Sequence, residues 1–149
     1  MMPSHKAQCA LDYLPEQLFD LAADVERYPE FLPWWIAARV QKRVGNIYFS
    51  DQIIGFKLFR ARFVSKTVLA RPGRIDVTSS DRLFRRFALT WLFEPLPGSG
   101  CQVQFLFDLE LRSKLTHELF RRTIDSTAGS IIAAFEARAH QVYGLPKSP

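Results

Sequence analysis

Few residues of this chain have the types and spacing that acid–base, nucleophilic or metal chemistry requires. The three histidines and two cysteines are scattered along the sequence, so they indicate neither a shared metal site nor a thiolate activated by a histidine. These residues are His5, His117, His140, Cys9 and Cys101. The sequence contains no nucleophile elbow, HExxH, CxxC or glycine-rich phosphate-binding motif. We therefore expect a protein that is not an enzyme and has no metal site.

Asp51 is the carboxylate that could do acid–base work if its side chain faced an interior cavity. Burial would raise its pKa, and Ser65 and Thr67 are the other polar candidates for such a site. We expect the Asp51 side chain to face solvent instead, and catalysis remains an alternative at this point.

Aromatic residues are unusually frequent, with 13 Phe, three Trp and four Tyr among 149 residues. Such an excess is typical of a dense core or of a cavity for a flat or greasy ligand. Each ring taken alone could simply fill a core, but together they favour an apolar pocket. The residues predicted to line it are Phe31, Leu32, Pro33, Trp34, Trp35, Phe49, Phe63, Phe87, Trp91, Phe105, Phe107, Ile124, Ile131 and Phe135.

The net charge is +5, and residues 57–86 alone contain nine basic and two acidic side chains. Residues 12–30 contain six acids and one arginine, so the molecule could orient itself on an anionic surface. Basic side chains on strands can also serve only to prevent edge-to-edge aggregation. Apolar residues beside cations near a hairpin tip predict a membrane or portal contact at Phe56, Lys57, Leu58, Phe59, Arg60, Arg85 and Arg86.

The elements that must position these residues follow from periodicity and turn signals. A strand is predicted at 5–13, a helix from Pro15 that stops before Pro29, and a helical turn or short second helix within 28–35. Turns at 45–46 and 71–73 and a loop at 95–100 separate further strands. These strands are predicted at 36–44, 47–54, 60–70, 74–80, 84–94 and 101–112.

A helical period begins at Ser113, which could cap the helix, as could Thr116, and Gly144 closes it. Gly129 in its middle costs about 1 kcal/mol relative to alanine, which close packing or room for a ligand would explain. The predicted apolar face consists of Leu115, Leu119, Ile124, Ala128, Ile131, Phe135 and Val142.

One long helix must therefore cover a sheet with a broad aromatic face. We predict an α+β fold in which a curved antiparallel sheet wraps around the helix and leaves a cavity. The chain is interpreted as one domain, 1–149, with about 144–149 as a tail. No apolar run reaches the roughly 20 residues of a membrane span, and the start MMPSHKAQ has no signal or transit pattern. We therefore expect one cytosolic domain.

Five stretches together resemble the coenzyme Q-binding START-like family, also labelled polyketide cyclase/dehydrase, which includes the bacterial ribosome association toxin. They are AADVERYPEFLPWW (22–35), GFKLFRARFVSK (55–66), WLFEP (91–95), GCQVQFLFDLELRS (100–113) and AAFEARA (133–139). The resemblance implies the helix-grip fold, with six to seven strands and two short helices after the first strand. It maps the family's YPEFLPW and GFK-F segments onto 28–34 and 55–59. Trp35 departs from the family, where cysteine is common, and a larger ring there would narrow the pocket mouth.

The resemblance also implies a function. Such a protein binds ubiquinone or a related isoprenoid lipid as a ligand, has no cofactor, and supports respiratory electron transfer without catalysis. Because the start has no transit pattern, a bacterial cytoplasmic protein is expected rather than a mitochondrial one. We expect peripheral contact with the anionic inner membrane and no DNA partner. Two alternatives stay open at this stage. One is a ribosome-binding toxin that blocks subunit association, and the other is a polyketide cyclase or dehydratase acting through Asp51, Ser65 and Thr67.

Overall fold

The structure, a computed structural model, describes residues 5–56 and 58–144. Seven strands, two α-helices and a 3₁₀ helix (η1) follow one another in the order that the sequence predicts. They are β1 (His5–Leu11), α1 (Pro15–Ala23), η1 (Val25–Glu30), β2 (Trp35–Val44), β3 (Ile47–Phe56), β4 (Phe59–Ala70), β5 (Arg74–Thr78), β6 (Phe84–Pro95), β7 (Cys101–Leu111) and α2 (Lys114–Tyr143).

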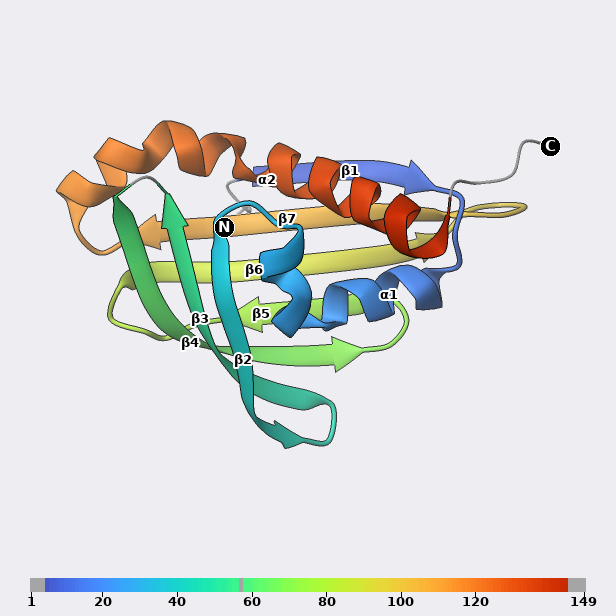
Figure 1. The fold of residues 1–149 in the computed structure, drawn as a ribbon, viewed down its shortest axis with the longest axis horizontal. Helices are drawn as coiled ribbons and strands as arrows, with labels where there is room; N and C mark the ends of the chain where they lie inside the picture. Colours follow the sequence, from blue (N-terminus) through green and yellow to red (C-terminus); the bar gives the residue numbers. More distant parts are fainter. Residues whose placement is uncertain (1–4, 57, 145–149) are drawn as a thin grey trace.

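The strands form one antiparallel sheet in the order β1-β7-β6-β5-β4-β3-β2. The sheet curves, and α2 lies along its concave side (Figure 1). Helix α1 packs against β5 and β6. This confirms the predicted helix-grip architecture, in which a sheet wraps around one long helix. None of the helices in the described ranges is long and apolar enough to cross a bilayer.

Strict alternation explains why β6 and β7 form the floor of the interior. Every second residue of β7 is buried, and β6 has the same pattern along most of its length. Alternate side chains of a strand point to opposite faces, so one face of each strand is apolar and the other is partly exposed. Helix α2 begins where predicted, because the Ser113 Oγ accepts a hydrogen bond from the Thr116 backbone N–H at 3.2 Å.

The helical segment before β2 differs from the prediction. Helix α1 ends at Ala23, and η1 contains Pro29 instead of stopping before it. The chain bends at Asp24 because Val25 and Tyr28 must both reach the core, where they are buried. A short 3₁₀ helix accommodates Pro29 more easily than an uninterrupted α-helix would.

The apolar face predicted for α2 is only partly correct. Ile124, Ala128, Ile131 and Phe135 are buried, but three of its predicted members are exposed: Leu115, Leu119 and Val142. At the start of the helix the inward stripe instead runs through positions 120, 123, 124 and 127. Close packing does not explain Gly129, because a methyl group added there would meet no atom within 4 Å.

The interior has a solid half and a hollow half. In the solid half, beneath the C-terminal part of α2, the ring of Trp91 lies 4.7 Å from the rings of both Phe105 and Phe135. Phe93 and Phe19 extend this cluster toward α1, with their ring centroids 6.0 Å apart. The hollow half lies beneath the N-terminal part of α2. Of the tail expected at 144–149, only Gly144 falls within the described residues.

Candidate functional site

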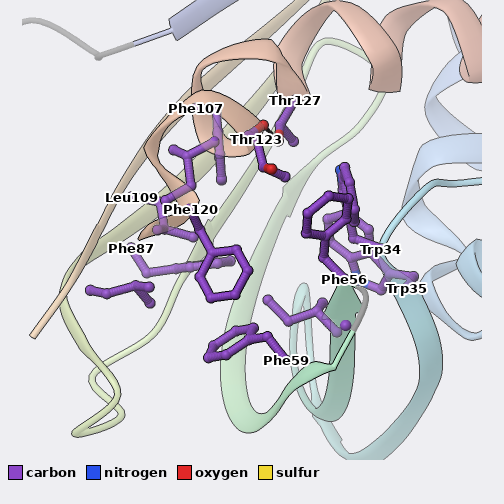
Figure 2. A pocket seen from close by; sticks show the side chains of 14 residues that line it. Trp34, Trp35, Phe56, Phe59, Phe87, Phe107, Leu109, Phe120, Thr123 and Thr127 are labelled. Atoms are coloured by element: carbon purple, nitrogen blue, oxygen red, sulfur yellow. Dashed lines mark hydrogen bonds between the residues drawn. The ribbon is translucent and has the colours of Figure 1, made fainter. Parts of the chain in front are cut away.

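An apolar pocket occupies the hollow half of the interior, between the first half of α2 and the ends of five strands (Figure 2). It encloses about 620 Å³ of space outside the atoms, including open solvent at its mouth. Only about 80 Å³ of this space is wide enough for the centre of a water molecule. The pocket is therefore a narrow slot that must widen to admit anything larger than a slender chain.

Five of the residues predicted to line a pocket do so. They come from the β2 entrance, from the sheet floor and from α2, and they are Trp34, Trp35, Phe87, Phe107 and Ile124. Nine lining residues were not predicted as pocket residues. Phe56 and Phe59 were expected as a membrane or portal contact, and the other seven are Ile54, Gly55, Leu109, Leu111, Phe120, Thr123 and Thr127. The sequence could have indicated Leu109 and Leu111, because they continue the alternation of inward apolar residues along β7.

The other predicted lining residues lie elsewhere. Phe63, Trp91, Phe105, Ile131 and Phe135 are buried in packed parts of the core and do not line the pocket.

Phe31, Leu32 and Pro33 belong to the turn before β2, where Phe31 lies beneath the Arg138 guanidinium at 5.1 Å and Leu32 is buried. None of the three lines the pocket. Phe49 points to the opposite face of the sheet, because its neighbours Tyr48 and Ser50 are the inward residues of β3. The structure thus corrects the placement of these four residues.

The hairpin tip between β3 and β4 also differs from the prediction. Phe56 and Phe59 are half-buried and turn into the pocket, whereas Leu58 between them is fully exposed. Arg60 is exposed beside them, and Lys57 lies outside the described residues.

Arg85 and Arg86 belong to the convex face of the sheet instead. They form ion pairs with Glu110 at 3.3 Å and with Asp108 at 3.2 Å. Three further arginines of the basic segment, Arg62, Arg71 and Arg74, are paired with acidic side chains. Much of its positive charge is therefore balanced on the protein itself.

Aromatic rings close the pocket between the hairpin and the helix. Phe120 of α2 lies 4.8 Å from Phe59 and 6.1 Å from Phe56, measured between ring centroids. On the other wall, the ring of Trp34 meets that of Phe56 at 4.4 Å. Figure 2 shows Phe120 and Phe59 facing each other, with Trp34 and Phe56 across the pocket. Side-chain rotation at Phe120 would widen the slot.

The backbone at the pocket entrance has an unusual conformation. Trp34 has a φ of 76°, a left-handed conformation that is rare for a residue with a large side chain. Its carbonyl oxygen accepts a hydrogen bond from the Gly55 N–H at 2.8 Å, which holds the turn against β3. The Trp34 Nε1–H is buried and makes no hydrogen bond within the described part of the chain. An unpaired buried donor on a pocket wall is suited to an oxygen of a ligand.

A buried polar cluster supports the neighbouring tryptophan, Trp35. The Trp35 Nε1–H donates to Gln52 Oε1 at 2.7 Å, and Gln52 Nε2 donates to Ser50 Oγ at 3.0 Å and Ser65 Oγ at 2.6 Å. Sequence reasoning singled out Ser65 but missed the cluster, although these polar positions alternate on neighbouring strands. The cluster fixes the Trp35 ring, so this wall of the pocket is preorganised.

Asp51 has no place in this site. It lies on the outer face of β3, where its carboxylate forms an ion pair with Arg62. Hydrogen bonding to that guanidinium holds the pKa of Asp51 below its ordinary value of 3.8, which is the opposite of what a buried general acid needs. Burial raises the pKa of Cys9 and of Cys101 to about 11, so both thiols stay protonated at neutral pH.

Comparisons with known proteins agree with this geometry. A family model described as polyketide cyclase / dehydrase and lipid transport matches residues 11–136. The ribosome association toxin RatA of Escherichia coli is 27% identical over 143 residues, which cover 96% of this chain and 90% of that protein. The mitochondrial coenzyme Q-binding protein COQ10 homolog B of Xenopus laevis is also 27% identical over 143 residues, covering 93% of this chain and 59% of the relative.

A solved structure is similar over nearly the whole chain. The solution structure of an 18 kDa protein from Caulobacter crescentus is 33% identical and has a TM-score of 0.74. The match covers 94% of this chain and 97% of that protein. Together with the family model, it confirms the START-like resemblance of the sequence motifs. The chain belongs to the polyketide cyclase / dehydrase and lipid transport family.

Proposed function

We propose that this protein binds ubiquinone or a related isoprenoid lipid in the apolar pocket and supports respiratory electron transport without catalysing a reaction. One observation carries the proposal. Of the fourteen residues that line the pocket, none has a titratable side chain, and all but two threonines and a glycine are aromatic or aliphatic. Such a lining is suited to an apolar ligand, but it offers no acid or base for a cyclase reaction.

The apolar lining of the pocket supports a ligand with an apolar tail. Each buried methylene contributes about 0.8 kcal/mol, so a few isoprene units are enough for strong binding. The Trp34 indole N–H has no partner in the described chain and suits the oxygen of a carbonyl-bearing head. Of the two threonines on the wall, Thr127 already donates its hydroxyl to the Thr123 backbone oxygen at 2.6 Å. A tail without a polar head would leave the Trp34 donor unpaired.

The relatives favour the same ligand class, and this ligand class in turn indicates where in the cell the protein acts. A protein named for coenzyme Q binding is 27% identical over most of this chain. A quinone resides in membranes, so a protein that binds it must meet a bilayer. We place this protein in a bacterial cytoplasm, in peripheral contact with the anionic inner membrane, with the lipid as ligand and no cofactor.

Native mass spectrometry with lipid extraction tests the proposal directly. The protein purified from its own host is expected to contain close to one quinone per chain. Ile124→Trp fills the pocket and should abolish the bound lipid, whereas Ser126→Trp, exposed on the same helix, should retain it. Wild-type protein that is empty and takes up no quinone from vesicles would contradict the proposal.

Ribosome binding is the second candidate, because the toxin RatA is 27% identical over 96% of this chain. Exposed cations would then contact ribosomal RNA, and binding would fall steeply with salt concentration. Ribosome profiles after overexpression distinguish the two functions. A shift toward free subunits that persists in Ile124→Trp would favour the ribosome over the pocket ligand.

A further inference from the structure

The most exposed large apolar side chains lie at the mouth of the pocket. Leu58, Leu115 and Leu119 have 102%, 83% and 75% of their surface exposed, more than any other large hydrophobic residue described. Leu58 directly precedes Phe59, and Leu119 directly precedes Phe120, and these two rings are 4.8 Å apart. The leucines thus come from both sides of the aromatic closure. In Figure 1 the start of β4 lies near the first turns of α2, in agreement with the contact of Phe59 and Phe120.

Basic side chains surround these leucines. Arg60 follows the hairpin tip, Lys114 opens α2, and Arg82 and Arg112 line a shallow hollow together with Phe59. None of the four forms an ion pair within residues 5–56 and 58–144, in contrast to the arginines of the convex face.

Two nearby acids are already engaged. Asp81 accepts a hydrogen bond from the Leu83 backbone N–H, and Glu118 pairs with Arg121. Asp81 keeps its negative charge in that hydrogen bond, but the four cations without an ion pair outnumber it, so this end of the molecule stays positive.

We propose that Leu58, Leu115 and Leu119 insert into an anionic phospholipid bilayer while the cations beside them contact the headgroup phosphates. Apolar side chains flanked by Lys and Arg have the composition of a surface that lies in a membrane interface. The inference deepens the proposed function, because this orientation holds the pocket mouth against the membrane in which the lipid resides. It replaces the contact first expected from Phe56, Phe59, Arg85 and Arg86, whose side chains are turned inward or paired.

Insertion also places the closure of the pocket at the bilayer surface. Leu58 and Leu119 directly precede the two rings that close the slot, so the contact between Phe59 and Phe120 lies where the protein meets the lipid. The apolar slot then opens directly into the hydrocarbon, and the lipid need not cross water.

Vesicle sedimentation with matched variants tests the surface. The triple variant Leu58→Asp, Leu115→Asp, Leu119→Asp should lose at least about tenfold in affinity for vesicles of phosphatidylglycerol and phosphatidylcholine. The control is Leu14→Asp, Val44→Asp, Val142→Asp, which changes three exposed apolar residues elsewhere and the charge by the same amount. Both variants are compared with wild type at a salt concentration that screens the effect of the lost net charge. Under that condition the control should bind vesicles with an affinity within about twofold of wild type. Serine at the three leucines provides a second variant that adds no charge.

The possible outcomes separate docking from ligand binding. Quinone supplied in detergent should bind wild type and all three variants alike, because the leucines do not line the pocket. Unchanged vesicle binding by both the aspartate and serine variants would overturn the docking surface and leave the pocket proposal intact. Vesicle binding that falls equally in the control would also overturn it. Loss of ribosome co-sedimentation with unchanged vesicle binding would assign the surface to the ribosome instead.

Discussion

The ring of Phe120 on α2 lies 4.8 Å from the ring of Phe59 on β4, and this contact joins the helix to the hairpin across the pocket. The two residues are far apart in sequence and belong to elements that otherwise leave a hollow between them. Because both rings are only half-buried, their contact is weaker than those of the solid core. It is therefore the place where the pocket can open at least cost.

Phe120→Ala should increase the rate of quinone uptake several-fold. Removal of the ring widens the slot, and the free energy of unfolding should fall by less than the roughly 3–5 kcal/mol of a fully buried Phe→Ala change. Stopped-flow fluorescence measures the rate, because Trp34 and Trp35 line the pocket and a bound quinone quenches them. Val142→Ala on the same helix serves as the control. An unchanged uptake rate would show that the ring is not the barrier.

Trp34→Phe should weaken binding of a quinone by about two- to tenfold, which corresponds to one hydrogen bond. The substitution keeps an aromatic ring on the pocket wall but removes the buried Nε1–H that has no partner in the described chain. Affinity for an isoprenoid hydrocarbon without oxygen should stay the same. Calorimetric titration of both ligands measures the difference, and equal losses for the two would mean that only packing had changed.

Asp51→Asn should leave ligand binding unchanged and should lower stability slightly at neutral pH. Arg62 holds the pKa of Asp51 below 3.8, so the stabilisation is present above about pH 4 and is lost as pH falls through the folded-state pKa. Denaturant titrations should therefore show a difference at about pH 7 that shrinks as pH falls below 3.8. Quinone affinity should be flat between about pH 5 and 8, since no titratable side chain lines the pocket. An affinity that changes over this range would instead mean that a titratable group acts on the bound ligand.

Gly129→Ala should raise the free energy of unfolding by about 1 kcal/mol and the melting temperature by a few degrees. The residue is exposed in the middle of α2, and an added methyl group would contact nothing within 4 Å. Gly55→Ala is the contrasting variant, because its methyl group would lie 2.5 Å from Ile36 Cδ1 and 3.1 Å from the Phe59 carbonyl oxygen. The melting temperature should rise for Gly129→Ala and fall for Gly55→Ala in thermal unfolding. A lower melting temperature for Gly129→Ala would indicate that the helix needs a flexible point there.

Local rules were sufficient to predict the framework from sequence. The alternation along β7, the turn at Gly45 and the Ser113 cap each depend on near neighbours in the chain, and each prediction is confirmed. The boundary of α1 is the exception, since the bend at Asp24 depends on burial of Tyr28 in a core built from distant strands.

The pocket was harder to predict because the same residue types fill a core and line a cavity. Phe105 and Phe107 stand two residues apart on one face of β7, yet only Phe107 lines the pocket. The position of α2 over the sheet decides which of the two rings faces the cavity. This position cannot be predicted from a local sequence pattern. Phe49 was misplaced for a simpler reason, because a one-residue error in strand phase exchanges the two faces of a sheet.

The separation of a solid half from a hollow half has a consequence for divergence among related proteins. Trp91 and its neighbours can secure folding whatever the rings around Trp34 and Phe120 become. Substitutions around the pocket should therefore change ligand specificity with little effect on the stability of the fold. A lineage built on this plan can acquire new ligands while its backbone hardly changes.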